Sequence, residues 1–183
     1  MRIISGSFKG KVIKGYDIEG TRPTMDRVKE SLFAMIQDYT RDSVVLDLFA
    51  GTGNLGFESI SNGAKYCYFN DKNIKCTTLI NKIIEELNIK DKTKVLNMDY
   101  IKALNYLLEN KIKLDLIFLD PPYKKNILNE IIEFIYNNKL LNENGLIICE
   151  IDELYLNDLY YTKIKEKKYG NKYIIIYKNT LIK

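Results

Sequence analysis

Apolar residues along the chain fall alternately into short continuous runs and into longer stretches with the period of an α-helix. The runs at 44–49 and 114–119 are short and rich in Val, Leu, Ile and Phe, which is typical of buried parallel strands. The stretch 25–38 instead places Leu32 and Ile36 four residues apart on one apolar face, which predicts a helix. The two kinds of segment alternate through most of the chain.

This alternation predicts a doubly wound α/β fold with a mostly parallel sheet, because successive parallel strands need helical crossovers. The strands are expected at 44–49, 65–70, 93–98, 114–119 and 145–151, and the helices at 54–62, 73–87, 100–110 and 125–137.

The two ends of the chain depart from the alternation. Residues 2–5 and 11–15 are expected to pair as a small β-hairpin that precedes the helix at 25–38. Near the other end, two β-rich runs at 160–168 and 173–179 leave no room for a helix between them, which predicts an antiparallel hairpin. We therefore expect an N-terminal arm at 1–41, made of a hairpin and a helix, and a main domain at 42–183.

Composition narrows the class of protein. The chain has 183 residues, 46% of them hydrophobic, which suits one compact domain. No apolar run approaches the roughly 20 residues of a membrane-spanning helix, and the first residues lack the apolar core of a signal peptide. Three cysteines without paired spacing favour reduced thiols, so we predict a cytoplasmic protein. The chain has no histidine, which excludes Ser-His and Cys-His nucleophiles and argues against a metal site.

Positive charge is concentrated at the start of the chain. Residues 1–29 contain seven basic and three acidic residues, a net charge of +4, so the remainder is expected to be close to neutral. A basic arm on a neutral body is typical of a phosphate-backbone contact, although a solubilising surface would look the same. The candidate contacts for a nucleic acid are Arg2, Lys9, Lys11, Arg22, Thr24 and Arg27.

A glycine-rich loop follows the strand at 44–49. Gly51, Gly53 and Gly56 have the GxGxxG spacing that lets a backbone approach a nucleotide at the N-terminus of a helix. The strand ends in Asp47, whose carboxylate would repel a pyrophosphate but can receive an ammonium group. Asp71, at the end of the next strand, is spaced to bind ribose hydroxyls, and Asp99 is placed to meet an adenine amino group. For each acid the alternative role is a helix N-cap.

A second motif, Asp120-Pro121-Pro122-Tyr123, directly follows the strand at 114–119. Two prolines make a stiff turn that cannot continue the sheet, so carbonyl oxygens stay fixed at the edge of the strands. Methylation of an exocyclic amine needs two acceptors for its N–H groups, and the Asp120 carboxylate and Pro121 carbonyl suit these roles. Tyr123 offers a ring on which the target base can stack.

These motifs together resemble the class I, Rossmann-like amino-methyltransferases that use S-adenosylmethionine. More narrowly, MRIISG at 1–6 and TRPTMDRVKESLF at 21–33 resemble the bacterial RsmD family, which methylates a guanine N2 in 16S ribosomal RNA. The resemblance implies a seven-stranded sheet, a monomer, a substrate in the assembled or partly assembled small subunit, and an arm that contacts RNA. It also implies cofactor contacts from Asp47, Phe49, Gly51, Gly53, Asn54, Asp71, Asp99 and Tyr100. The family pattern has Glu at the ribose-binding position, where this chain has Asp71.

The sequence thus predicts transfer of a methyl group from S-adenosylmethionine to a guanine N2 of 16S ribosomal RNA, without a metal. Several alternatives remain at this point. A DNA amino-methyltransferase shares the catalytic turn but usually needs a separate sequence-reading domain, and a protein-glutamine methyltransferase would carry Asn at position 120. An NAD-dependent oxidoreductase would leave Asp47 and Asp120 unexplained. A methyltransferase acting on another RNA, and a non-catalytic RNA-binding assembly factor with the same fold, also stay open.

Overall fold

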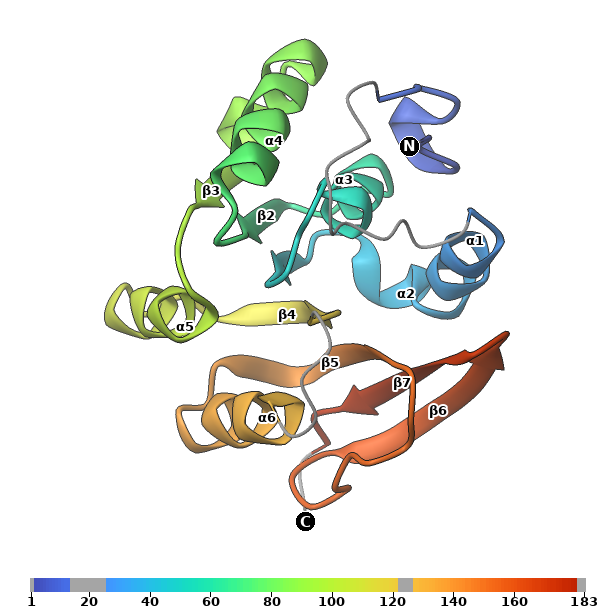
Figure 1. Cartoon of the computed structure of the whole chain (residues 1–183), viewed down its shortest axis with the longest axis vertical. Coiled ribbons are helices and arrows are strands. Elements are labelled where there is room, and N and C mark those ends of the chain that lie inside the picture. Colours follow the sequence, from blue (N-terminus) through green and yellow to red (C-terminus); the bar gives the residue numbers. More distant parts are fainter. Residues whose placement is uncertain (1, 14–25, 122–126, 181–183) are drawn as a thin grey trace.

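The computed structural model describes residues 2–13, 26–121 and 127–180, which build a seven-stranded sheet flanked by helices (Figure 1). The strand order is β3-β2-β1-β4-β5-β7-β6. The strands are β1 (Val44–Asp47), β2 (Tyr66–Asn70), β3 (Thr93–Leu96), β4 (Leu114–Leu119), β5 (Leu141–Ile151), β6 (Thr162–Tyr169) and β7 (Lys172–Lys178). The helices are α1 (Asp26–Met35), α2 (Gln37–Thr40), α3 (Asn54–Ser61), α4 (Ile74–Leu87), α5 (Tyr100–Glu109) and α6 (Ile127–Asn137), with short 3-10 turns η1 (Gly6–Phe8) and η2 (Lys90–Lys92).

The order of the strands confirms the predicted doubly wound α/β fold. Strands β1 to β5 run parallel, and β7 pairs antiparallel with both β5 and β6. The chain proceeds outwards from β1 through β2 to β3, and then returns to the other side of β1 with β4. This reversal creates a switch point between β1 and β4, where open α/β sheets bind ligands beyond the carboxyl ends of the strands.

Two apolar cores cover the two faces of the sheet. One core joins side chains of α1, α3 and α4 to residues such as Phe69 and Phe118. The other joins α5 and α6 to residues such as Ile117 and Ile175. β5 and β7 contribute alternate residues to both cores, as expected for strands buried on both faces.

The N-terminal arm is less regular than the predicted hairpin. Arg2 and Val12 form an isolated antiparallel bridge, and the chain between them makes the turn η1. Gly6 has a φ of 76°, and a Cβ at this position would lie 1.8 Å from the carbonyl oxygen of Ser61. The backbone therefore packs too closely on the end of α3 to continue as a ladder.

The helix predicted at 25–38 is interrupted at Ile36. This residue has φ −110° and ψ 12°, so the chain leaves α1 and re-enters helical geometry as the short α2. Ile36 is fully buried, which indicates that its apolar anchoring outweighs the loss of a continuous helix. Among the residues described, no helix has the length and apolar character to cross a membrane.

Candidate active site

The predicted cofactor and catalytic motifs meet at the switch point between β1 and β4. Asp47, the last residue of β1, is in register with Phe118 of β4, and Asp120 follows two residues later. Paired residues of neighbouring strands project from the same face of a sheet. The two carboxylates are therefore brought to one edge and one face, although 73 positions separate them in the sequence.

The glycine loop closes over the end of β1. Gly51 and Gly53 have φ values of 54° and 80°, in the left-handed region that favours glycine. The amide of Gly51 donates to Oδ2 of Asp71 at 2.9 Å, and the amide of Asn73 donates to Oδ1 of Asp71 at 2.8 Å. Asp71 thus fixes the loop against the end of β2.

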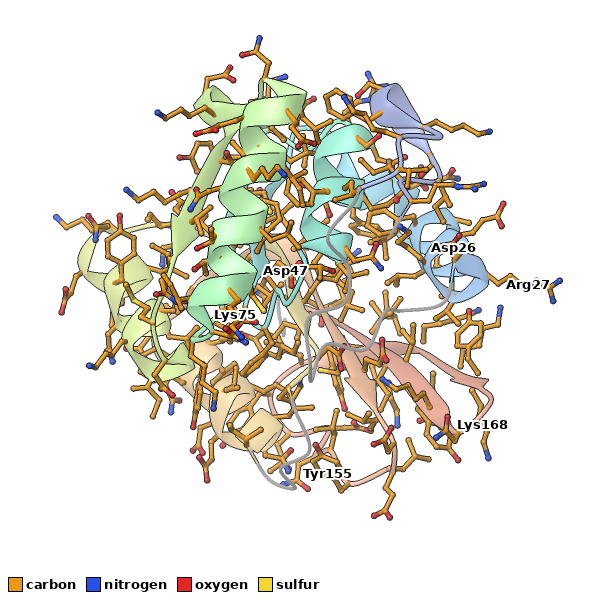
Figure 2. All side chains as sticks on the ribbon, turned by 45° about the horizontal axis from the view of Figure 1, so that its top comes forward. Asp26, Arg27, Asp47, Lys75, Tyr155 and Lys168 are labelled. Atoms are coloured by element: carbon orange, nitrogen blue, oxygen red, sulfur yellow. The ribbon has the colours of Figure 1, made fainter. Side chains whose placement is uncertain are left out.

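Asp47 lies beneath this loop. Its side chain is buried inside the molecule (Figure 2). Its Oδ2 accepts a hydrogen bond from the amide of Gly56 at 3.0 Å. The pKa of Asp47 is raised to about 7, mainly by burial and in part by the nearby Asp71 charge, against the lowering effect of the Gly56 hydrogen bond. A cation bound beside Asp47 would relieve this unfavourable burial of negative charge.

Two aromatic rings lie at the same edge of the sheet, since the ring centroids of Phe49 and Tyr100 are 5.8 Å apart. Asp99 is exposed and caps α5, since its Oδ1 accepts from the amide of Ile101 at 3.0 Å. The alternative N-cap role is therefore present in the structure.

One buried acceptor at the same edge lacks a partner. Oδ1 of Asn70, the last residue of β2, makes no hydrogen bond to any residue that the structure describes, while its Nδ2 donates to the carbonyl of Leu48. An orphaned acceptor beside buried carboxyl groups and a glycine loop fits a ligand that carries hydrogen-bond donors and positive charge. These acceptors therefore suit S-adenosylmethionine, which carries an ammonium group and a positively charged sulfur.

At the catalytic turn, Asp120 is flanked by charges of both signs. Nζ of Lys172, from the start of β7, lies 4.0 Å from Oδ1 of Asp120 and also binds Glu150 near the end of β5. The pKa of Asp120 is raised to about 7 by burial first and then by the charges of Glu150, Asp47 and Asp152, against the lowering effect of Lys172. Pro121 follows directly, whereas Tyr123 lies outside the described residues.

A buried ion pair attaches the arm to α3, the helix that follows the glycine loop. Nζ of Lys29 lies 3.0 Å from Oε2 of Glu58 and donates to Oδ1 of Asn54 at 2.8 Å and to the carbonyl of Arg2 at 2.6 Å. Glu58 in turn accepts from the amides of Ile4 and Ser5. Lys29 was counted among the basic charges of the arm, but it is fully buried and offers no charge to an external partner.

The predicted RNA contacts are not gathered in one place. Arg2, Lys9, Lys11 and Arg27 are exposed, while Arg22 and Thr24 lie outside the described residues. Lys9 follows η1, which contacts Ser61 at the end of α3 opposite to Asn54. Because a helix rises 1.5 Å per residue, η1 lies about 10 Å along the axis of α3 from its first residue, Asn54. Arg27, on α1, is the predicted contact whose helix also reaches the C-terminal hairpin.

Sequence reasoning missed four charged residues at the site, namely Lys29, Glu58, Glu150 and Lys172. One signal was available for Lys29, because its charge falls on the apolar face of the helix predicted at 25–38. Lys172 and Glu150 gave no such signal, since their proximity depends on the register between β5 and β7.

Comparison with known proteins shows the family of this chain. The family model Conserved hypothetical protein 95 matches residues 1–178. YlbH of Bacillus subtilis is 38% identical over 97% of this chain and 98% of its own length. Ribosomal RNA small subunit methyltransferase D of Haemophilus influenzae is 34% identical over 98% of this chain and 94% of its own length. The solved structure described as "Putative methyltransferase yhhF from Escherichia coli" superposes with a TM-score of 0.86 at 27% identity, over 98% of both chains.

The fold and the site define a class I methyltransferase, a class that uses S-adenosylmethionine as methyl donor. Within that class, the chain belongs to the Conserved hypothetical protein 95 family, which includes the RsmD methyltransferases.

Proposed function

We propose that this protein transfers a methyl group from S-adenosylmethionine to the exocyclic N2 of a guanine in 16S ribosomal RNA. The observation that carries the proposal is the position of Asp120 and Pro121 at the switch point, beside the glycine loop and Asp47. The names of the relatives support ribosomal RNA of the small subunit as substrate. We further propose that it acts in the cytoplasm as a monomer, on an assembled or partly assembled subunit.

The proposed site divides the chemistry between binding and orientation. S-adenosylmethionine supplies an electrophilic methyl group on a positively charged sulfur. Asp47 would receive the ammonium group, Asp71 the ribose hydroxyls, and Asp99 the adenine amino group. Phe49 and Tyr100 would line the adenosine site, while Gly51, Gly53 and Asn54 would hold the loop against the cofactor.

Catalysis would depend on two acceptors for the amine. The Asp120 carboxylate and the Pro121 carbonyl would each accept one N–H of the target guanine, which directs the nitrogen lone pair towards the methyl carbon. The bound cofactor would supply the methyl carbon for the new N–C bond and would keep the electrons of the broken C–S bond as a neutral thioether, and the methylated nitrogen would release its proton to solvent. Tyr123 would stack on the base, which must be unpaired or flipped out.

The proposal is tested with labelled S-adenosylmethionine and three substrates: small subunits from a strain lacking the gene, naked ribosomal RNA, and duplex DNA. We expect N2-methylguanosine in ribosomal RNA, identified by mass spectrometry of the nucleosides. Label in DNA, or no label despite cofactor binding, would refute the substrate assignment.

Asp120→Ala tests the catalytic assignment separately. We expect cofactor affinity to persist and the rate of methyl transfer to fall by about 10² or more, because one of the acceptors that orient the amine is lost. Near-normal turnover in this variant would refute the role of Asp120.

A further inference from the structure

The C-terminal hairpin carries more positive charge than the N-terminal arm. Residues 162–178 contain six lysines and one glutamate, a net charge of +5. The prediction that the chain beyond residue 29 is neutral therefore holds only as a sum, because the rest of that segment carries −5. Most of the charge that balances the hairpin lies elsewhere in the main domain, and the rest in residues 30–41.

The charges of the hairpin are sorted between its two faces. Lys165 and Lys167 are in register with Ile176 and Ile174, which pack against α1, so they project to the α1 side of the sheet. Glu166 projects to the opposite side, where it pairs with Lys163. On the α1 side, the exposed charges of β6 are thus all lysines.

The same face touches the arm through one residue of α1. Oγ of Ser31 accepts from the hydroxyl of Tyr169 at 2.6 Å and from Nζ of Lys167 at 3.1 Å. Arg27 is exposed and lies one helical turn before Ser31, so it shares this side of α1. Figure 2 shows Arg27 reaching outwards from α1, whereas Lys168, in register with Tyr173, belongs to the opposite face of the hairpin.

The row of lysines leads away from the catalytic turn. Tyr169 is paired with Lys172, whose ammonium group is 4.0 Å from Asp120. From Tyr169 back to Lys165 the strand advances four residues, about 13 Å at 3.3 Å per residue. Lys165 also lines a hollow of about 270 Å³ with Met35 and Ile36, so its stem rests on apolar surface while the side chain remains exposed.

We propose that Lys165 and Lys167 of β6, together with Arg27 of α1, bind the phosphate backbone of the substrate RNA next to the target nucleotide. The proposal rests on the proposed RNA methyltransferase function and adds a second binding segment, remote in sequence from the basic arm. A polynucleotide fits this surface because its charge is regularly spaced and complementary to lysines that alternate along a strand. Lys9, which follows η1 at the far end of α3, contacts RNA more distant from the target base.

The test compares Lys165→Gln/Lys167→Gln with a matched double variant, Lys90→Gln/Lys92→Gln. The control lysines are exposed in η2, next to β3 at the opposite edge of the sheet. Affinity for a 16S ribosomal RNA fragment containing the target is measured at several salt concentrations, along with turnover at saturating RNA and the affinity for S-adenosylmethionine.

We expect the β6 variant to bind RNA about tenfold more weakly at low salt, with a logarithmic salt dependence less steep by about 1.5, since two phosphate contacts are lost. Turnover at saturating RNA and cofactor affinity should match the wild type, and the control should match it throughout. Ser31→Ala, which removes the hydrogen bonds of Lys167 and Tyr169 but no charge, should keep the wild-type salt dependence.

An unchanged salt dependence in the β6 variant would overturn the proposal and leave its lysines with the role of preventing edge-to-edge strand pairing. So would an equal loss in the control variant, which would indicate non-specific attraction. If the wild-type protein itself fails to methylate the RNA, the proposed function fails, whatever the salt dependence shows.

Discussion

The carboxyl group of Asp120 lies between a lysine that favours its charged form and acids that oppose it. Lys172 belongs to β7, Glu150 to β5 and Asp47 to β1, and Asp152 directly follows β5. Only the charged carboxylate has both oxygens available as acceptors for the amine. The balance among these groups therefore sets the pH at which the proposed acceptor becomes available.

Lys172→Met is expected to move the acidic limb of the pH–kcat profile upwards by about one unit, because loss of a cation about 4 Å away raises the pKa of Asp120. Glu150→Gln is expected to move it downwards, since it removes a like charge. Methyl transfer is measured from pH 5 to 9 at saturating substrates.

Lys178→Met provides the control for these two variants. Lys178 lies on the same strand, but its ammonium group is over the ring of Tyr39, 5.3 Å from the centroid. Equal shifts in all three variants, or shifts of the same sign for Lys172→Met and Glu150→Gln, would disprove the electrostatic role.

At the scale of elements, the arm is joined to α3 by a buried lysine rather than by a strand ladder. Lys29 connects α1, the start of α3 and the carbonyl of Arg2. A buried charge that loses its partner is costly, although the intact pair itself contributes little net stability. The pair fixes how the arm lies against α3 and the glycine loop.

Lys29→Met should lower the free energy of unfolding by about 3–5 kcal/mol, because Glu58 would be left buried without its partner. Urea unfolding followed by circular dichroism measures the change, with the exposed Lys102→Met on α5 as control. A loss below about 1 kcal/mol would mean that Glu58 is satisfied by the amides of Ile4 and Ser5 alone.

Gly56 determines the fit of α3 on the sheet. A Cβ at this position would lie 2.2 Å from Cε1 of Phe69, and the ring of Phe69 is itself packed on Phe57 at a centroid distance of 4.8 Å. Gly56→Ala should therefore cost about 1–3 kcal/mol through overpacking, in spite of the higher helix propensity of alanine. The midpoint of thermal unfolding tests this, and an unchanged or higher midpoint would show that the helix can shift without cost.

The limits of an element could be predicted where nearby residues decide them, and could not where contacts remote in sequence do. The limits of β4 and the hairpin turn at 169–172 follow from local patterns, and the structure matches both. The break at Ile36 was not predicted, because apolar periodicity continues through it and only tertiary burial interrupts the helix. The first strand of the arm was predicted too long for a similar reason, since the contact of Gly6 with Ser61 is remote in sequence.

The candidate site was predictable to the extent that strand ends define it. Asp47 and Asp120 were expected to share an edge because parallel strands end together, and the register of β1 with β4 confirms that position. Their functional roles remain predictions. Lys172 could not be assigned beside Asp120 from the sequence, because the pairing of an antiparallel edge hairpin depends on register rather than on local composition.

At the scale of the whole molecule, the burial of Asp47 in the proposed cofactor site lowers the free energy of unfolding at neutral pH. Asp47 is buried with a pKa of about 7, compared with 3.8 for an ordinary aspartate. The folded protein therefore binds this proton more tightly than the unfolded chain does. By linkage, the contribution of Asp47 to stability is largest below pH 4 and falls as the pH rises towards 7.

Replacement by Asn removes this titration and isolates its effect. Relative to the wild type, Asp47→Asn should gain stability between pH 4 and pH 8, by a few kcal/mol for a shift of about three pKa units. Unfolding by urea at several pH values measures the difference, in which the titration of all other groups cancels. A difference that stays constant with pH would show that the carboxyl group is not held against its ionisation.

Saturating S-adenosylmethionine should reverse the order of stability of the two proteins at pH 8. A ligand that binds only the folded state stabilises it according to its affinity, and the proposed ammonium contact requires the charged form of Asp47. Wild-type affinity for the cofactor should therefore weaken as the pH falls below 7, while the affinity of Asp47→Asn should be low and independent of pH. If instead both proteins bind equally well at every pH, Asp47 has only a structural role beneath the glycine loop, and the ammonium group must be received elsewhere.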